Sequence, residues 1–175
     1  MPERKIRARA AVQAASRKIE KMLRKSPAYR KVEDGLYAVK QGSSMVMIKV
    51  HPWKDHAVVR LVAQLVKGVS MDEPLTLELL GLNAVLRFGA FAYVPEGQAI
   101  VLCHTLLDRD LGNRQEFLES IRDFAFVADD FDDRIAARYG GQTMEDLMEE
   151  SVLANVRKVA GPDPADQPLA GRERQ

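Results

Sequence analysis

The chain has 175 residues, of which 46% are apolar, and this length and composition are typical of one globular domain with its own hydrophobic core. Its one cysteine, Cys103, cannot form an internal disulfide, which argues against a small secreted protein and favours the cytoplasm. No segment approaches the roughly 18 apolar residues of a membrane span, and residues 1–9 lack the apolar stretch of a secretory signal. We therefore expect no integral membrane association.

The net charge is only +1, but the charges are distributed unevenly along the chain. Residues 1–31 hold eleven Lys and Arg against two Glu, a net of +9, so the rest of the chain carries a net of −8. Such a segment attracts acidic surfaces. The candidate contacts for an acidic partner are nine cations of this segment: Arg4, Lys5, Arg7, Arg9, Arg17, Lys18, Lys21, Arg24 and Lys25.

The predicted elements begin with a helix over residues 6–25, where Gly and Pro are absent and apolar residues recur at helical spacing. It ends before Pro27, because the residue preceding a proline disfavours helix. Residues 35–40 and 44–50 then form a predicted β-hairpin. Residues 56–67 fit a helix or a strand, and their β-branched content favours a strand.

A short helix and a second hairpin follow. Ser70 and Glu73 have the spacing of a capping box, which predicts a helix beginning just after them. Residues 88–94 and 98–106 are predicted strands, joined by a turn at residues 95–97.

The longest predicted helix spans residues 113–138 and ends at Gly140 and Gly141. A last helix is expected over residues 143–159. Residues 161–175 have too few apolar side chains to bury and are interpreted as a disordered tail. One face of the long helix carries apolar residues spaced by three or four, which we take as candidate protein contacts: Phe117, Ile121, Phe124, Phe131 and Ile135.

The order of helix, three strands, helix, two strands and long helix predicts an α+β fold, in which helices pack on an antiparallel sheet of about five strands. We divide the chain into a basic N-terminal helix (1–31), the α+β domain (32–141), a C-terminal helix (142–160) and the tail (161–175).

Several short segments between residues 79 and 141 carry a resemblance, namely 79–83 (LLGLN), 87–91 (RFGAF), 96–97 (EG), 100–106 (IVLCHTL), 128–133 (ADDFDD) and 139–141 (YGG). They resemble the YbjN-domain family of bacterial proteins, which is related in fold to type III secretion chaperones. The similarity covers roughly residues 36–141. It implies a non-enzymatic, chaperone-like protein that binds peptide segments, commonly as a homodimer. The basic first helix lies outside this region, so the resemblance does not identify the partner.

Four aspartates cluster in the long helix, at 129, 130, 132 and 133. Asp129 and Asp133 share a helix face and could offer oxygen ligands to a hard cation. However, Asp130 is placed to pair with Arg134, and no glycine turn or alternating ligand loop is present, so we favour a solvated face and expect no metal. An intermediate interpretation is that this face receives a basic segment, such as the first helix, which keeps Asp129 and Asp133 as candidate protein contacts.

Cys103 and His104 could suggest a thiol nucleophile and its base. Adjacent residues of a strand point to opposite faces, so these two cannot pair. We interpret Cys103 as a core residue and expect no catalytic residues and no cofactor.

His51, Trp53 and His56 fall in an expected loop between strands. An exposed Trp53 would be a natural anchor for a protein partner. The alternative is that Trp53 covers the edge of the core, since tryptophan is usually largely buried.

Two functions therefore stay open. The first is a protein- or peptide-binding module that uses the sheet face or edge, Trp53 or the long helix. The second is a nucleic-acid-associated regulator that contacts phosphates through the basic helix, although this helix lacks aromatic residues for base stacking or membrane insertion. A metal-dependent enzyme at the aspartates is a weaker third possibility.

Overall fold

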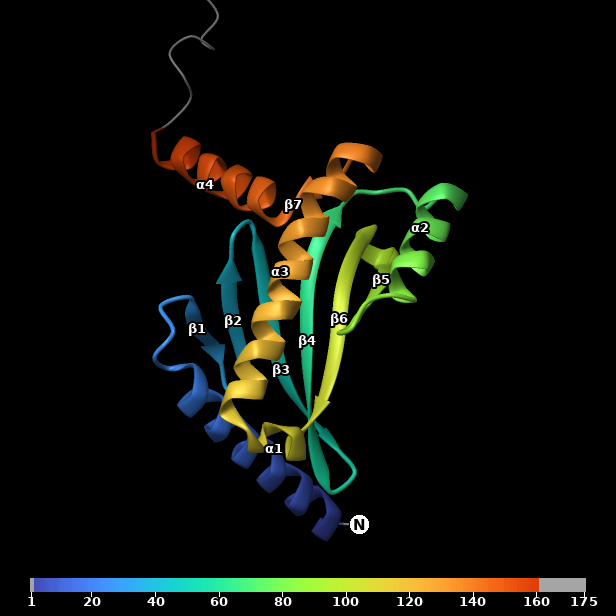
Figure 1. Ribbon diagram of the computed structural model, residues 1–175. Coiled ribbons are helices and arrows are strands. Elements are labelled where there is room, and N and C mark those ends of the chain that lie inside the picture. Colours follow the sequence, from blue (N-terminus) through green and yellow to red (C-terminus); the bar gives the residue numbers. More distant parts are fainter. Residues whose placement is uncertain (1, 161–175) are drawn as a thin grey trace, which may run out of the picture.

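The computed structural model describes residues 2–160, which form a seven-stranded antiparallel sheet with four α-helices (Figure 1). The predicted α+β class is confirmed. The strands are β1 (Tyr29–Glu33), β2 (Leu36–Gln41), β3 (Ser44–Trp53), β4 (His56–Lys67), β5 (Ala90–Val94), β6 (Ala99–Leu107) and β7 (Gln142–Thr143). The helices are α1 (Pro2–Leu23), α2 (Glu73–Asn83), α3 (Arg114–Tyr139) and α4 (Met144–Ala160). The tail predicted over residues 161–175 lies outside the described residues.

The strands run in the order β1-β2-β3-β4-β6-β5, and β7 pairs with the end of β4. Two strands, β1 and β7, were not predicted. In β1 four of the five residues are exposed, so the segment lacks the apolar alternation that indicates a strand. Its pairing with β2 is what makes it a strand.

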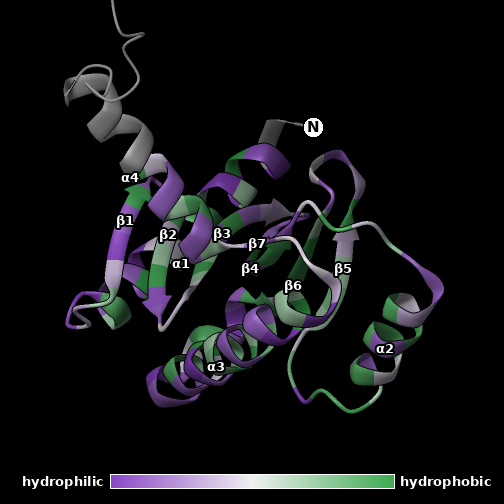
Figure 2. Cartoon of the chain, turned by 90° about the horizontal axis from the view of Figure 1, so that it is seen from above, coloured by the Kyte–Doolittle hydropathy of each residue, from purple (hydrophilic) through white to green (hydrophobic). Residues whose placement is uncertain are grey.

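One face of the sheet is covered by α3 and α1. In β4 the alternating residues Ala57, Val59, Leu61 and Ala63 point to this face and are fully buried. Helix α3 runs along β2, β3 and β4, and α1 packs on β3 and β4. Figures 1 and 2 both place α2 beside β5, and α4 at the opposite side of the sheet near β1 and β2.

Helix α1 belongs to the same core as the sheet. Its residues Ala15, Ile19 and Leu23 are buried, as their spacing predicts. The Tyr37 hydroxyl donates to the Ser16 carbonyl at 3.3 Å, which ties β2 to α1. The apolar stripe of α1 therefore packs in the core, and the charged side chains of α1 face outward.

Two local details differ from the sequence predictions. The segment that contains Trp53 is not a loop, because β3 continues to that residue and β4 begins at His56. Lys54 adopts a left-handed backbone, φ 52°, in the tight turn between them. The N-cap of α2 is Asp72, whose side chain accepts from the Leu75 amide at 2.9 Å, so the expected capping box of Ser70 is wrong.

Candidate functional site

The face of the sheet opposite α1 and α3 carries a continuous apolar row. Ala38, Met47, Val62, Cys103 and Ala90 follow one another in register across β2, β3, β4, β6 and β5. The three central residues of the row are half-buried, whereas their neighbours on the opposite face are mostly buried. The row is thus apolar surface with only partial cover. Cys103 belongs to it, so the prediction that Cys103 lies in the core holds only in part.

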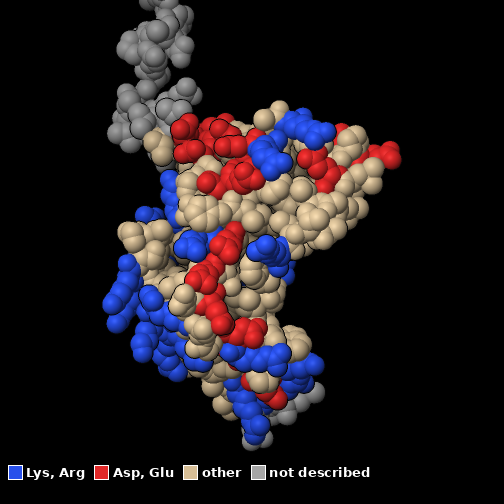
Figure 3. Space-filling view, in the orientation of Figure 1, with Lys and Arg blue, Asp and Glu red and all other residues tan. Residues whose placement is uncertain are grey.

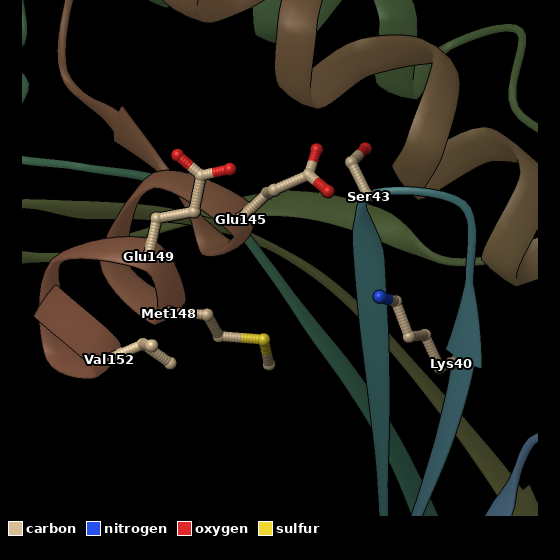
Figure 4. A pocket seen from close by; sticks show the side chains of 6 residues that line it. All are labelled: Lys40, Ser43, Glu145, Met148, Glu149 and Val152. Carbon is tan, nitrogen blue, oxygen red and sulfur yellow. The ribbon is translucent and has the colours of Figure 1, made fainter. Parts of the chain in front are cut away.

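Two hollows meet over one end of this face. The larger, about 910 Å³, lies over β1, β2 and β3, and its apolar lining includes Ala38, Met45 and Met47. The smaller, about 390 Å³, lies between the β2–β3 hairpin and α4 (Figure 4). Lys40 and Met148 line both hollows. We call the two together the sheet groove, and its principal residues are Arg30, Ala38, Lys40, Met45, Met47, Met148 and Val152.

Methionine supplies much of the apolar lining of the sheet groove. Met45 and Met47 stand two residues apart on β3, and Met148 projects from α4 toward the hairpin (Figure 4). Methionine is unbranched and polarisable, so it adapts to differently shaped apolar partners, and it is frequent at surfaces that bind varied segments. The groove is therefore suited to contact apolar side chains without a single fixed shape.

Helix α4 forms one wall of the groove, and its first turn is fixed by a capping box. The amide and hydroxyl of Thr143 donate to the Asp146 carboxylate at 2.8 and 2.9 Å, and the Asp146 amide donates back to the Thr143 hydroxyl at 3.2 Å. The bonds from Thr143 hold the pKa of the Asp146 carboxyl below its usual range.

The β2–β3 turn beside the groove is anchored by two aspartates of α3. The amide and hydroxyl of Ser43 donate to Asp129 at 2.7 and 2.8 Å. The hydroxyls of Ser43 and Ser44 donate to Asp132 at 3.0 and 2.7 Å. Asp132 is fully buried, and burial raises the pKa of its carboxyl, while the serine hydroxyls and the Asp133 amide act in the opposite direction.

The aspartate cluster is therefore not one solvated face. Asp132 is buried and Asp129 is half-buried on the hairpin turn, so the two serines occupy the place that we assigned to a basic segment. Asp130 pairs with Arg134 at 2.9 Å, as predicted, and Asp133 is exposed. Among the side chains that the structure describes, no three of His, Cys, Asp or Glu are arranged to hold a metal ion.

The apolar stripe of α3 packs on its own sheet. Phe117, Ile121, Phe124 and Ile135 are between 0% and 4% exposed, and Phe131 is half-buried with its ring 5.2 Å from that of Phe91. These five residues, which the sequence suggested as protein contacts, thus serve mainly as core. Apolar residues spaced by three or four identify the apolar face of a helix, but the spacing does not show whether the chain's own core covers that face.

Trp53 lies at the far end of β3 from the sheet groove, beside the turn to β4. It is 46% exposed, and the Lys54 ammonium lies 4.7 Å from the centre of its ring. It is accessible to a partner, but it is not part of the groove.

Cys103 and His104 point to opposite faces of β6, as their adjacency requires. His104 lies edge-on to Phe88, with 6.0 Å between the ring centres, and burial lowers the pKa of its imidazole. The two side chains do not form a nucleophile and base.

The basic side chains of α1 gather along its outer surface, seen at the lower left of Figure 3, while acidic side chains form a stripe over α3. Arg4 pairs with Asp55 at 3.7 Å. Four of the other predicted cations, together with Arg114, line a hollow of about 620 Å³ at the end of the helix: Lys18, Lys21, Arg24 and Lys25.

Four residues of the sheet groove were not predicted from the sequence as site residues: Lys40, Met45, Met47 and Met148. The signal that was present is the alternation in β3, where Met45, Met47 and Lys49 face one way and Val46, Ile48 and Val50 face the other. An alternation shows that a strand has two faces, but it does not show which face the helices leave uncovered.

An antiparallel sheet with helices on one face and a partly covered, methionine-lined groove on the other is an arrangement suited to binding. The family model described as "T3SS (YopN, CesT) and YbjN peptide-binding chaperone 1" matches residues 9–147, and the chain belongs to this family. The resemblance to YbjN-domain proteins is thus confirmed. The match also includes most of α1, which we had placed outside the similar region. A search of curated proteins finds no match. In the described part of the chain, no helix is long and apolar enough to cross a membrane.

Proposed function

We propose that this protein is a non-enzymatic, chaperone-like module of the bacterial cytoplasm, and that it holds a segment of a partner protein in the sheet groove. The observation that carries the proposal is the incompletely covered apolar face of the sheet, with Met45, Met47 and Met148 around one hollow. Membership of a family of peptide-binding chaperones supports it.

The groove offers a bound segment two kinds of contact. Its larger hollow, about 910 Å³, is at the upper end of the range for sites that hold small ligands, roughly 300–1,000 Å³, and can take several peptide side chains. Beside it, β1 is the outermost strand, so an extended segment can add to the sheet there through backbone hydrogen bonds. The methionines then provide adaptable contacts for the apolar side chains of that segment.

The test is an immobilised library of 15-residue peptides, probed with the labelled full chain and two variants. Met47→Asp places a charge in the centre of the groove, and we expect it to abolish most binding. Phe126→Asp is the matched control, because Phe126 is an exposed apolar residue, 50% accessible, on α3 at the other face. Equal peptide binding by Met47→Asp and the parent chain would refute the groove as the site.

We also propose that two copies of the chain associate through α2. Leu77, Leu80 and Val85 are 61%, 60% and 75% exposed on or just after this helix, and this is a natural surface to cover with a second copy. Sedimentation velocity should show a dimer that Leu80→Asp converts to a monomer. A monomeric parent chain would exclude this interface.

A second candidate function is nucleic-acid binding by α1. The observation that favours it is the hollow lined by Lys18, Lys21, Arg24, Lys25 and Arg114. Binding of this kind weakens steeply with salt, because counterions are released from the phosphates. A fluorescent single-stranded oligonucleotide should bind the parent chain with such a slope, and the triple variant K18E/K21E/R24E should not bind. Undetectable binding by the parent chain at low salt would remove this function.

A further inference from the structure

The charge pattern around the sheet groove narrows the kind of segment that can bind there. Arg30 and Lys40 line the larger hollow, and among its described lining residues none is acidic. Lys31 also lines it but is already paired, with Glu20 at 3.0 Å and Asp34 at 2.7 Å. Arg30 and Lys40 are left as exposed cations at the border of an apolar floor.

The cationic border continues along the open face of the sheet. Arg60 on β4 is exposed and stands opposite Lys49 of β3, in the row next to the apolar row. Lys49 is partly neutralised by Glu33, whose carboxylate lies 2.7 Å away. Arg60 therefore adds a third exposed cation to a face whose centre is apolar.

Helix α4 presents both apolar and acidic side chains at this border. Its Met148 enters both hollows, and Glu145 and Glu149 line the smaller hollow together with Lys40. In Figure 4, Lys40 and Met148 extend toward one another across the gap, and the two glutamates stand on the adjoining turns of α4. The chain thus places an acidic segment with apolar side chains of its own at the edge of the groove.

From this charge complementarity we propose that the segment bound in the sheet groove is acidic and amphipathic. Its apolar side chains contact Ala38, Met45 and Met47, and its carboxylates lie near Arg30, Lys40 and Arg60. The inference rests on the proposed function and specifies its substrate class. Exposed ion pairs are individually weak, so three of them together should favour an acidic segment over a basic one by about tenfold at low salt.

The peptide library tests the inference through the composition of the peptides that depend on Met47. These binders should be enriched in Asp and Glu and depleted in Lys and Arg. The strongest of them is then compared, by fluorescence anisotropy in solution, with a version in which every Asp and Glu is replaced by Lys. We expect the reversed peptide to bind the parent chain about tenfold more weakly, with a smaller difference at high salt.

A double variant of the full chain, R30E/K40E, should lose or invert this preference. The matched control is R109E/R122E, which makes the same change of net charge at two exposed residues outside the groove, and it should keep the preference. Two results would overturn the inference and leave the proposed function standing. The first is a set of Met47-dependent peptides that is not enriched in Asp and Glu, and the second is equal affinity of the parent chain for the acidic peptide and its reversed version. A library without Met47-dependent binders would overturn both the inference and the proposed function.

Discussion

Asp129 and Asp132 illustrate how much a single side chain of this protein depends on a distant partner. Both belong to a run of aspartates on α3, yet their hydrogen-bond partners are Ser43 and Ser44, which precede them by 86 to 89 residues. Beside them Gly42 has φ +53°, and a Cβ at that position would overlap the Asp129 carboxylate. The turn that borders the sheet groove is thus shaped jointly by the hairpin and by α3.

Replacement of Asp129 tests this anchor. Asp129→Ala leaves the Ser43 amide without its acceptor and the Ser43 hydroxyl with Asp132 alone, so we expect the free energy of unfolding to fall by about 1–3 kcal/mol. Asp130→Ala is the control, because it removes only an exposed pair with Arg134 and should cost less than about 0.5 kcal/mol. Urea denaturation measures both. Equal losses in the two variants would contradict the anchoring role of Asp129.

The buried Asp132 predicts a pH dependence of stability. Because burial raises the pKa of its carboxyl, the folded chain binds this proton more tightly than the unfolded chain does. Its contribution to stability is therefore most favourable below the usual pKa of aspartate and falls as the pH rises through the range above that value. Asp132→Asn mimics the protonated form, so its stability relative to the parent should be greater at pH 7 than at pH 4.

Urea denaturation at these two pH values measures the effect. Asp133→Asn provides the control, since Asp133 is exposed. An identical difference between Asp132→Asn and the parent at pH 4 and pH 7 would show that the carboxyl titrates as it does in the unfolded chain.

Among the helices and strands, the sequence predicts best those whose buried residues recur at a regular spacing. The stripes of α1 and α3 and the alternation in β3 indicate these elements because each buries one face against the other layer. Strand β1 is not predicted because its residues are mostly exposed and show no apolar alternation. Strand β7 is not predicted because two residues are too few to show an alternation. Both are strands because they pair with a neighbour, β1 with β2 and β7 with β4, and not because of an apolar pattern of their own.

Only part of the candidate site could be predicted, for the same reason. The spacing of Phe117 and Ile121 identifies an apolar face of α3, but the chain's own sheet covers it. Met45 and Met47 alternate with buried residues, but their exposure depends on where α1, α3 and α4 pack. The sequence thus indicates which residues share a face, whereas the packing of the helices decides which face is free for a partner.

The cap of α4 leads to a prediction about the wall of the groove. Asp146→Ala removes the acceptor of the Thr143 amide and hydroxyl, so the first turn of α4 should open more often. Amide hydrogen exchange over residues 147–150 should then become several-fold faster. Glu149→Ala, which leaves the cap intact, should not change it. Unchanged exchange in Asp146→Ala would mean that α4 is held by other contacts.

At the scale of the whole molecule, the predicted functions fall on different surfaces. The cations of α1 face outward beside the acidic stripe of α3 (Figure 3), whereas the sheet groove lies on the face of the sheet opposite α3. The exposed leucines of α2 lie at the far side of the sheet from β1 and α4 (Figure 1). A partner segment, a nucleic acid and a second copy of the chain can therefore be distinguished by variants in separate places.

Methionine methyl resonances report directly on whether a peptide segment binds in the sheet groove. The chain has seven methionines, and Met45, Met47 and Met148 line the groove, whereas Met22 lies on α1 and Met71 precedes α2. The full chain, labelled with carbon-13 at the methionine methyl groups, is titrated with the strongest peptide from the library. We expect the signals of Met45, Met47 and Met148 to shift together while those of Met22 and Met71 stay in place. Shifts confined to Met22 or Met71, with the three groove signals unmoved, would contradict it.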